Sequence, residues 1–240
     1  ERRRAIRLRG AIAIGALVVT SLLAAALYRS QLFAIETIEV SGTVALDEAD
    51  VRARVELPDD ATLLRFPRAD IESALETDPW IADARLVRVL PGTLRVEIQE
   101  RVALAVIDTG MTFWYVDAEG RFLGEATLET TAAPLPVIRD VPALEPEPGA
   151  IADSPALTNA LQVLQGLGTE LSSMVRAVSA ASPHETTLVT ESTVEIMVGE
   201  ASQLPEKVAL ALGIMAEQGT DVVFIDVRSI ERPISRGLGR

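Results

Sequence analysis

The stretch that decides the fold is ARLVRVLPGTLRVEIQER, residues 84–101. Its two ends, Ala84–Leu90 and Leu94–Glu100, are rich in Val, Ile and Leu, and in the second end these alternate with polar residues. This pattern is typical of β-strands with one buried face. The dipeptide Pro91-Gly92 between them is typical of a tight turn. The stretch therefore predicts an antiparallel hairpin whose apolar face needs other elements to cover it.

The residues before the hairpin predict one more strand and two short helices. Ile35–Ser41 alternates between apolar and polar residues. Glu48–Glu56 follows a helix-capping Asp, and a second helix is predicted from Pro67 to the Asp-Pro pair at 78–79. The order strand, helix, helix, strand, strand predicts a compact α+β domain over residues 33–101, with both helices on one face of a three-stranded sheet.

The residues after the hairpin predict a second domain over residues 102–228, of mixed β structure with two helices. Its predicted strands are 102–107, 113–117, 121–124, 175–180, 187–190, 194–198 and 221–228. The predicted helices, 153–167 and 204–217, carry apolar stripes that would pack on the sheet. Residues 229–240 are mostly polar and are predicted to be a C-terminal tail. The fold class is therefore α+β, with a C-terminal edge strand at 221–228.

The first 28 residues differ in charge from the rest of the chain. Residues 1–9 hold five Arg and one Glu, and residues 10–28 contain no charged residue. Eighteen of these uncharged residues would span about 27 Å as a helix, close to the roughly 30 Å hydrocarbon core of a bilayer. The positive cluster precedes the span. The positive-inside rule therefore predicts a cytoplasmic basic tail at 1–9, a single transmembrane helix at 10–28, and the remaining chain outside the cell membrane.

Two other interpretations of the apolar stretch stay open. A buried helix of a globular domain is one, although such helices seldom lack charge over nineteen residues. A cleaved signal peptide is the other, with Ala24-Ala25-Ala26 as its cleavage site. Against it, the apolar run exceeds the roughly 7–15 residues of a signal-peptide core, and the alanines lie inside the run. We favour an uncleaved anchor.

The composition excludes several classes of chemistry. The chain of 240 residues has no Cys, a single His and a net charge of −13. Thiol catalysis, iron–sulfur clusters and Cys-ligated zinc are excluded, and His184 alone cannot supply a multi-histidine metal site. The negative charge argues against nucleic acid as the main partner. His184 lies in a Pro-containing turn, 182–185, and pairs such as Asp59-Asp60 are predicted to be loop charges, so we expect no metal, cofactor or catalytic site.

Several segments together resemble one family. Phe33–Gly42 followed by Leu46–Val51 looks like a membrane-proximal POTRA domain, and residues 90–101 resemble the hairpin that ends that domain in the FtsQ/DivIB cell-division proteins. Further segments that resemble the same family, in the same order, are Tyr115–Phe122, Pro134–Val137 and Phe224–Arg228. Each segment alone is a weak signal, but their order behind one apolar span is specific. The chain therefore resembles the FtsQ/DivIB family over most of its length.

The resemblance implies a non-enzymatic scaffold of the cell-division machinery. Such a protein crosses the membrane once, at 10–28, and carries a POTRA domain and a β-domain outside. It would bind the coiled-coil membrane proteins FtsB and FtsL (DivIC and FtsL), contact other divisome components, and help to control septal peptidoglycan synthesis. The resemblance also implies location at the division septum and no cofactor.

The candidate partner-binding site is the predicted last strand, 221–228, with the segment after it. A strand at a sheet edge has free N–H and C=O groups, which a partner strand can bind. We expect Val223, Ile225 and Val227 to face the core, and Arg228 to reach a carboxylate of the partner. The predicted partner-binding residues are Val222, Phe224, Asp226, Arg228, Ser229, Ile230, Glu231 and Ile234.

Three other functions remain open from the residues alone. One is an extracytoplasmic enzyme that cuts the cell wall through paired carboxylates. Another is a POTRA-type transport or chaperone component, although such proteins usually carry tandem POTRA domains or a membrane barrel. The third is a secreted β-domain protein, which would have lost residues 1–26.

Overall fold

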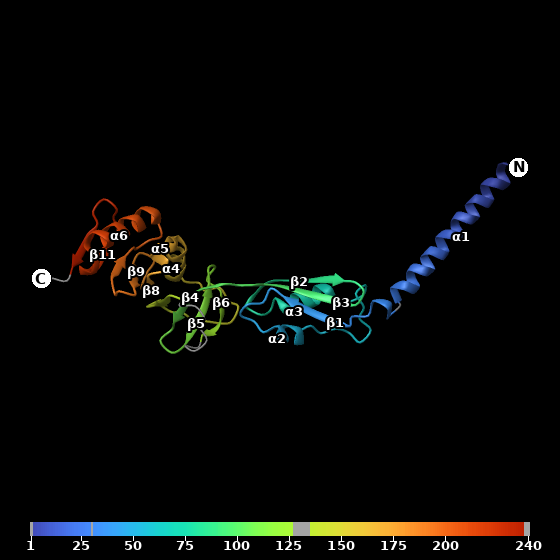
Figure 1. Ribbon diagram of the computed structural model, residues 1–240, viewed down its shortest axis with the longest axis horizontal. Helices are drawn as coiled ribbons and strands as arrows, with labels where there is room; N and C mark the ends of the chain where they lie inside the picture. The colour runs from blue at the N-terminus through green and yellow to red at the C-terminus, as the bar shows by residue number, and fades with distance from the viewer. Residues whose placement is uncertain (1, 30, 127–134, 238–240) are drawn as a thin grey trace. The chain divides into compact units, whose positions relative to one another are not determined.

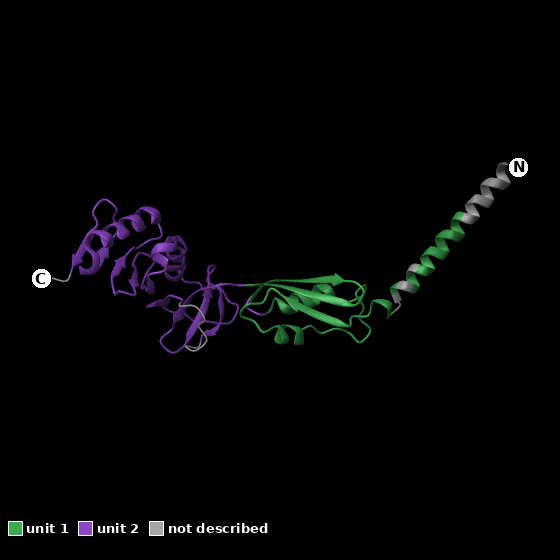
Figure 2. Ribbon diagram, viewed as in Figure 1, with its two compact units in different colours: residues 1–77, 81–100 green, residues 78–80, 101–240 purple. Residues whose placement is uncertain are grey.

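The structure is a computed structural model that describes residues 2–29, 31–126 and 135–237. Within the first helix, the side chains of residues 2–12, 24, 27 and 29 are outside this description. The chain divides into two compact units, coloured separately in Figure 2. Unit 1 comprises residues 1–77 and 81–100, and unit 2 comprises residues 78–80 and 101–240. Each unit has its own hydrophobic core.

The N-terminal helix α1 runs from Arg2 to Arg29 and contains the predicted span, residues 10–28. Within that span, the side chains of residues 10–12, 24 and 27 lie outside the described set. A search of the described residues finds no helix that combines the length and the apolar character needed to cross a membrane.

Unit 1 contains the strand–helix–helix–strand–strand order that the sequence predicts. The elements are β1 (Thr37–Ser41), α2 (Glu48–Ala53), α3 (Arg68–Leu75), β2 (Ile81–Val89) and β3 (Thr93–Glu100), with a short 3-10 turn, η1, at Gln31–Phe33. The predicted hairpin is confirmed, because β2 and β3 pair antiparallel with Leu86 opposite Val96. β1 pairs parallel to β3, so the sheet order is β1-β3-β2 and the hairpin's second strand lies at its centre.

The core of unit 1 lies between the helices and one face of this sheet. Leu94, Val96 and Ile98 are at most 6% exposed, as the alternation in β3 predicts. Val51 of α2 and Leu75 of α3 belong to the same buried cluster. Both helices therefore cover the same face, and the other face carries most of the polar residues of the three strands.

Unit 2 is built on one nine-stranded sheet, with the order β12-β11-β10-β9-β8-β7-β4-β5-β6. Figure 1 labels β4, β5, β6, β8, β9 and β11 of this sheet. Its strands are β4 (Ala103–Asp108), β5 (Phe113–Asp117), β6 (Phe122–Ala126), β7 (Val137–Arg139), β8 (Val175–Ala180), β9 (Thr186–Thr190), β10 (Glu195–Met197), β11 (Val222–Asp226) and β12 (Ile234–Gly237). Its helices are α4 (Pro155–Gly166), α5 (Gly168–Ser172) and α6 (Leu204–Gln218), followed by a 3-10 turn, η2 (Gly219–Asp221).

The helices of unit 2 pack on the part of the sheet nearest its C-terminal edge. α4 packs against β8 and β9, and α6 packs against β11 (Figure 1). The predicted stripe of α4 is confirmed, because Leu157 and Leu161 are at most 2% exposed and Leu164 is also buried. The hydroxyl of Ser154 caps this helix by accepting a hydrogen bond from the N–H of Leu157. The α4 and α6 contacts hold the C-terminal strands in place.

The prediction that 221–228 forms the edge of the sheet is wrong. β11 lies between β10, which pairs parallel to it, and β12, which pairs antiparallel to it. The edge strand is β12, inside the segment that was predicted to be a tail. A turn reverses the chain between the two strands, because the carboxylate of Asp226 accepts a hydrogen bond from the N–H of Arg228, and the N–H of Arg232 donates to the carbonyl of Ser229.

The predicted alternation of β11 also fails at its first residue. Val222 was expected on the outer face but is 2% exposed, whereas Val223 is only half-buried. The cause is a β-bulge between Val222 and Phe224, where the register with β12 shifts. A bulge inserts one residue and changes the side to which the preceding residue points. From Phe224 to Val227 the predicted alternation holds.

Candidate functional site

The outer edge of β12 presents free backbone groups. The N–H of Val227 donates to the carbonyl of Met197 in β10, 3.0 Å away, so the odd-numbered residues at the end of β11 bond toward β10. Backbone groups alternate between the two sides of a strand, so Phe224 and Asp226 bond toward β12. Their register partners are Arg236 and Ile234. The N–H and C=O groups of Ser235 and Gly237 therefore point away from the sheet.

The face of the sheet away from α6 carries an aromatic–cation pair beside this edge. Phe224 and Arg236 lie opposite each other in the register, and the guanidinium carbon of Arg236 lies 4.6 Å from the centre of the Phe224 ring. Such a contact holds the guanidinium over the face of the ring, and Arg236 is exposed. Ile234 lies on the same face and is 57% exposed. The edge is thus flanked by one positive and one aliphatic side chain.

Asp226 and Arg228 form a forked ion pair within the chain. Nη2 of Arg228 lies 2.7 Å from Oδ2 of Asp226, and Nε lies 3.1 Å from Oδ1. Hydrogen bonds from the Arg228 side chain are the main reason that the pKa of Asp226 lies below its ordinary value. The same pair raises the pKa of Arg228. The guanidinium that was predicted to reach a partner is therefore already bound to its neighbour.

The other face of β12 is tied to the end of α6. Ser235 lies opposite Ile225, and its hydroxyl accepts a hydrogen bond of 2.7 Å from Nε2 of Gln218. Ile225 itself is fully buried. The strand is thus attached to the core through one side-chain hydrogen bond and the backbone ladder with β11.

The predicted site residues separate into three groups. Phe224, Asp226 and Ile234 share the face away from α6. The turn between β11 and β12 contains Arg228, Ser229, Ile230 and Glu231. Val222 lies in the core. Ser235, Arg236 and Gly237 make up most of the true edge and were not among the predicted residues. The only local signal for them was Pro233, because sheets tolerate Pro mainly at edge strands and strand starts.

The opposite edge of the nine-stranded sheet is partly covered. The carbonyl of Phe122 in β6 accepts a hydrogen bond of 2.8 Å from Gly149, and its N–H donates to Ala150 over 2.9 Å. No such backbone or side-chain group bonds to the outer side of β12 among the residues that the structure describes. Of the two edges of this sheet, β12 is therefore the better acceptor for an added strand.

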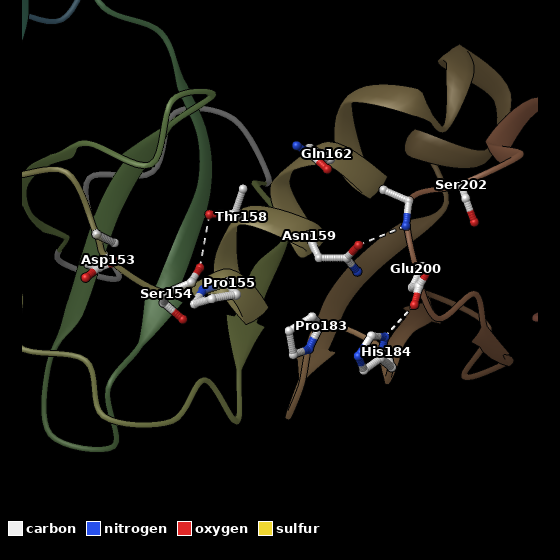
Figure 3. A pocket seen from close by; sticks show the side chains of 12 residues that line it. Asp153, Ser154, Pro155, Thr158, Asn159, Gln162, Pro183, His184, Glu200 and Ser202 are labelled. Carbon is white, nitrogen blue, oxygen red and sulfur yellow. Dashed lines mark hydrogen bonds and ion pairs between the residues drawn. The ribbon is translucent and has the colours of Figure 1, made fainter.

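A cavity of about 600 Å³ lies between the start of α4 and two loops of unit 2 (Figure 3). Asn159 spans it by donating to Thr186 and Gly199 and accepting from the N–H of Ala201. His184 contacts the carboxylate of Glu200. The hydroxyl of Ser182 hydrogen-bonds with the Glu185 carboxylate and the backbone N–H of His184, and the structure shows no hydroxyl on the His184 ring in the part of the chain it describes. The cavity therefore lacks the hydroxyl–imidazole contact of a nucleophilic triad.

The described residues also contain no group of three or more His, Asp or Glu placed to hold a metal ion. The edge of β12 differs from the cavity in presenting unpaired backbone groups, which suit protein recognition.

Comparison with known proteins matches the chain to two family models. Residues 33–101 match the POTRA domain of FtsQ type, and residues 105–228 match the C-terminal domain of the cell division proteins FtsQ/DivIB. Among curated proteins, "Cell division protein FtsQ" of Chloroflexus aurantiacus is 28% identical over 84% of this chain and 73% of its own length. "Cell division protein FtsQ" of Caulobacter vibrioides is 32% identical over 39% of this chain.

The match covers only part of several relatives. It spans 31% of the Caulobacter vibrioides protein and 58% of "Cell division protein FtsQ" of Mycobacteroides abscessus. The two family models nevertheless match this chain over both units, in the order that the fold requires. The chain belongs to the FtsQ/DivIB family of cell division proteins.

Proposed function

We propose that this protein is a non-enzymatic, membrane-anchored scaffold of the divisome that binds an FtsB/FtsL-like (DivIC/FtsL-like) coiled-coil pair. A strand of the FtsB-like partner adds to the outer edge of β12. Through this contact the scaffold helps to control septal peptidoglycan synthesis. The single observation that carries the proposal is the free outer side of β12, at one edge of the nine-stranded sheet.

The chemistry of the edge supports a strand as the ligand. Ser235 and Gly237 offer their N–H and C=O groups, and Arg236 offers a cation that is held by Phe224. A partner strand with an acidic residue opposite Arg236 and an aliphatic residue opposite Ile234 would match both flanking side chains. Asp226 and Arg228 act in this arrangement by fixing the turn that brings β12 back to β11.

Helix α1 supports the proposed anchor. Its described side chains from residue 13 to 23 are exposed, and large apolar ones such as Leu17 and Leu23 are 69% and 66% exposed. Exposed apolar side chains around a helix are favourable in lipid and unfavourable in water. We place residues 10–28 in the cell membrane, residues 1–9 in the cytoplasm and both units outside, at the septum.

The test uses two variants of one residue in the full chain. Ser235→Pro removes an N–H that points to the partner and leaves the bonds between β12 and β11 in place. Ser235→Ala removes only the hydroxyl that contacts Gln218. We expect Ser235→Pro to raise the dissociation constant for the FtsB/FtsL-like pair by about tenfold or more, and Ser235→Ala to leave it within about threefold. Calorimetric titration in detergent measures both.

An equal affinity for wild-type protein and Ser235→Pro would show that the partner does not pair with the edge of β12. A matched loss in both variants would assign the effect to the Gln218 contact instead of the backbone. Far-ultraviolet circular dichroism confirms that each variant keeps its sheet.

A further inference from the structure

The β2 strand of unit 1 is also an edge strand, but two of its outward N–H groups, near the middle of the strand, are occupied. Oε1 of Glu72 accepts a hydrogen bond of 2.8 Å from the N–H of Leu86, and Oε1 of Glu76 accepts one of 3.3 Å from the N–H of Ala84. Both Glu residues belong to α3 or its C-cap. Ala84 and Leu86 are two residues apart, so their N–H groups point to the same side of β2, away from β3.

The Glu72 carboxylate accepts a hydrogen bond from α3 as well as from β2. Nε of Arg68, one turn earlier in α3, donates to the same Oε1 atom over 2.8 Å. Partial burial of the Glu72 carboxyl raises its pKa, but the hydrogen bonds from Leu86 and Arg68 and the charges of Arg68 and Arg85 outweigh it, and the net pKa is lowered. Glu72 is therefore ionised at neutral pH and is a strong acceptor for a backbone N–H.

Without these carboxylates, β2 would be a good site for strand addition. It is nine residues long, and its side chains include only three charged residues, Asp83, Arg85 and Arg88. Long edge strands with free N–H groups pair readily with other chains, and proteins commonly block them. Carboxylates reaching over from a neighbouring helix are such a block.

The sequence of β2 also suits pairing with itself. In an antiparallel pair of two β2 strands about a twofold axis at Ala84, Asp83 of each copy lies opposite Arg85 of the other. Both side chains are on the sheet face that the helices leave open, and they already contact each other within one chain at 3.7 Å. Opposite charges directly across an antiparallel pair stabilise it.

We propose that Glu72 and Glu76 form a carboxylate latch that closes the β2 edge, and that opening the latch lets two copies of this chain pair through β2. The latch keeps unit 1 from self-association by strand pairing. It leaves the binding of a partner strand at β12 unaffected, because it acts on a different sheet.

The first experiment compares the full chain with the Glu72→Ala/Glu76→Ala variant in non-ionic detergent. Hydrogen–deuterium exchange of peptides covering residues 82–88 should accelerate about tenfold at low protein concentration, because two N–H groups lose their acceptors. Analytical ultracentrifugation should show a concentration-dependent dimer for the variant only. The Glu72→Gln/Glu76→Gln variant keeps oxygen acceptors and should stay monomeric.

Charge reversal tests the register of the dimer. In the Glu72→Ala/Glu76→Ala background, Asp83→Arg alone would place two like-charged pairs across the twofold axis and should abolish the dimer. Adding Arg85→Asp restores opposite charges and should restore it. A monomeric Glu72→Ala/Glu76→Ala variant with unchanged exchange would overturn the latch, and a dimer insensitive to Asp83→Arg would overturn the pairing. Thermal unfolding of each variant identifies any that has lost its fold.

Discussion

At the scale of single residues, the Asp226–Arg228 pair decides where the chain turns. The side chain of Asp226 is mostly buried and accepts hydrogen bonds from three nitrogen atoms of Arg228: the backbone N, Nε and Nη2. Sequence analysis identified both residues but assigned Arg228 to a partner. The guanidinium of an Arg binds a carboxylate of its own chain as well as one of a partner. Binding the neighbouring carboxylate has the smaller entropic cost.

This pair predicts how stability depends on pH. The pKa of Asp226 is lower in the folded protein than in the unfolded chain, so the pair stabilises the fold above the ordinary Asp pKa. That contribution is lost as the pH falls through the lowered pKa. Asp226→Asn should lower the free energy of unfolding at pH 7 by about 1 kcal/mol, and the difference from wild type should shrink steadily below about pH 4.

Urea unfolding at a series of pH values measures this difference. If the difference in unfolding free energy between wild type and Asp226→Asn stays constant down to pH 2, Asp226 contributes through its shape and not through its charge.

At the scale of elements, the local sequence pattern predicted those helices and strands whose own residues show a clear pattern. The hairpin of residues 84–101, helix α4 and strand β8 follow from alternation, capping and apolar stripes. β7 was missed because it has only three residues, and its pairing with β4 and β8 is parallel and distant in sequence. No local rule signals such a strand.

The C-terminal edge strand of the nine-stranded sheet was predicted at the wrong segment for a related reason. Whether a strand lies at an edge depends on every segment that follows it, and β12 is only four residues long. Its sequence follows Glu, Arg and Pro, which are typical of a tail. The four residues Ile-Ser-Arg-Gly contain one large apolar side chain and show no alternation that could outweigh the composition of their surroundings.

Deleting residues 229–240 tests whether β12 itself is the binding edge. The truncated protein keeps β11, whose side toward β12 is then free. We expect it to lose measurable binding of the FtsB/FtsL-like pair, because Ser235 and Arg236 are removed. Biolayer interferometry with the immobilised partner pair measures this. A higher affinity in the truncated protein would instead show that the partner competes with β12 for the edge of β11.

At the scale of the whole molecule, the resemblance found in the sequence is confirmed. Segments that were individually weak identified the FtsQ/DivIB family because they occur in a fixed order, and both family models match in that order. The binding residues could not be fixed in the same way, since they depend on which strand closes the sheet.

The proposed anchor predicts a result in cells. Replacing residues 10–28 with an unrelated single-pass anchor should leave septal localisation and growth unchanged, because the proposed binding site lies in unit 2. Removing the anchor while keeping secretion should abolish division at ordinary expression levels. Complementation of a depleted strain measures both, with fluorescence at the septum as the second readout. Failure of the replaced anchor would assign a specific contact to the native helix.

The shortness of β12 limits how tightly a strand can be held there. Two outward residues offer at most four backbone hydrogen bonds to an added chain, and at about 1 kcal/mol net each they correspond to a millimolar dissociation constant. A contact of that strength forms and breaks quickly in free solution. A larger fraction of the protein is bound when both proteins are confined to the same membrane, because confinement raises their effective concentration. A four-residue strand therefore suits the proposed contact between two proteins anchored in one membrane.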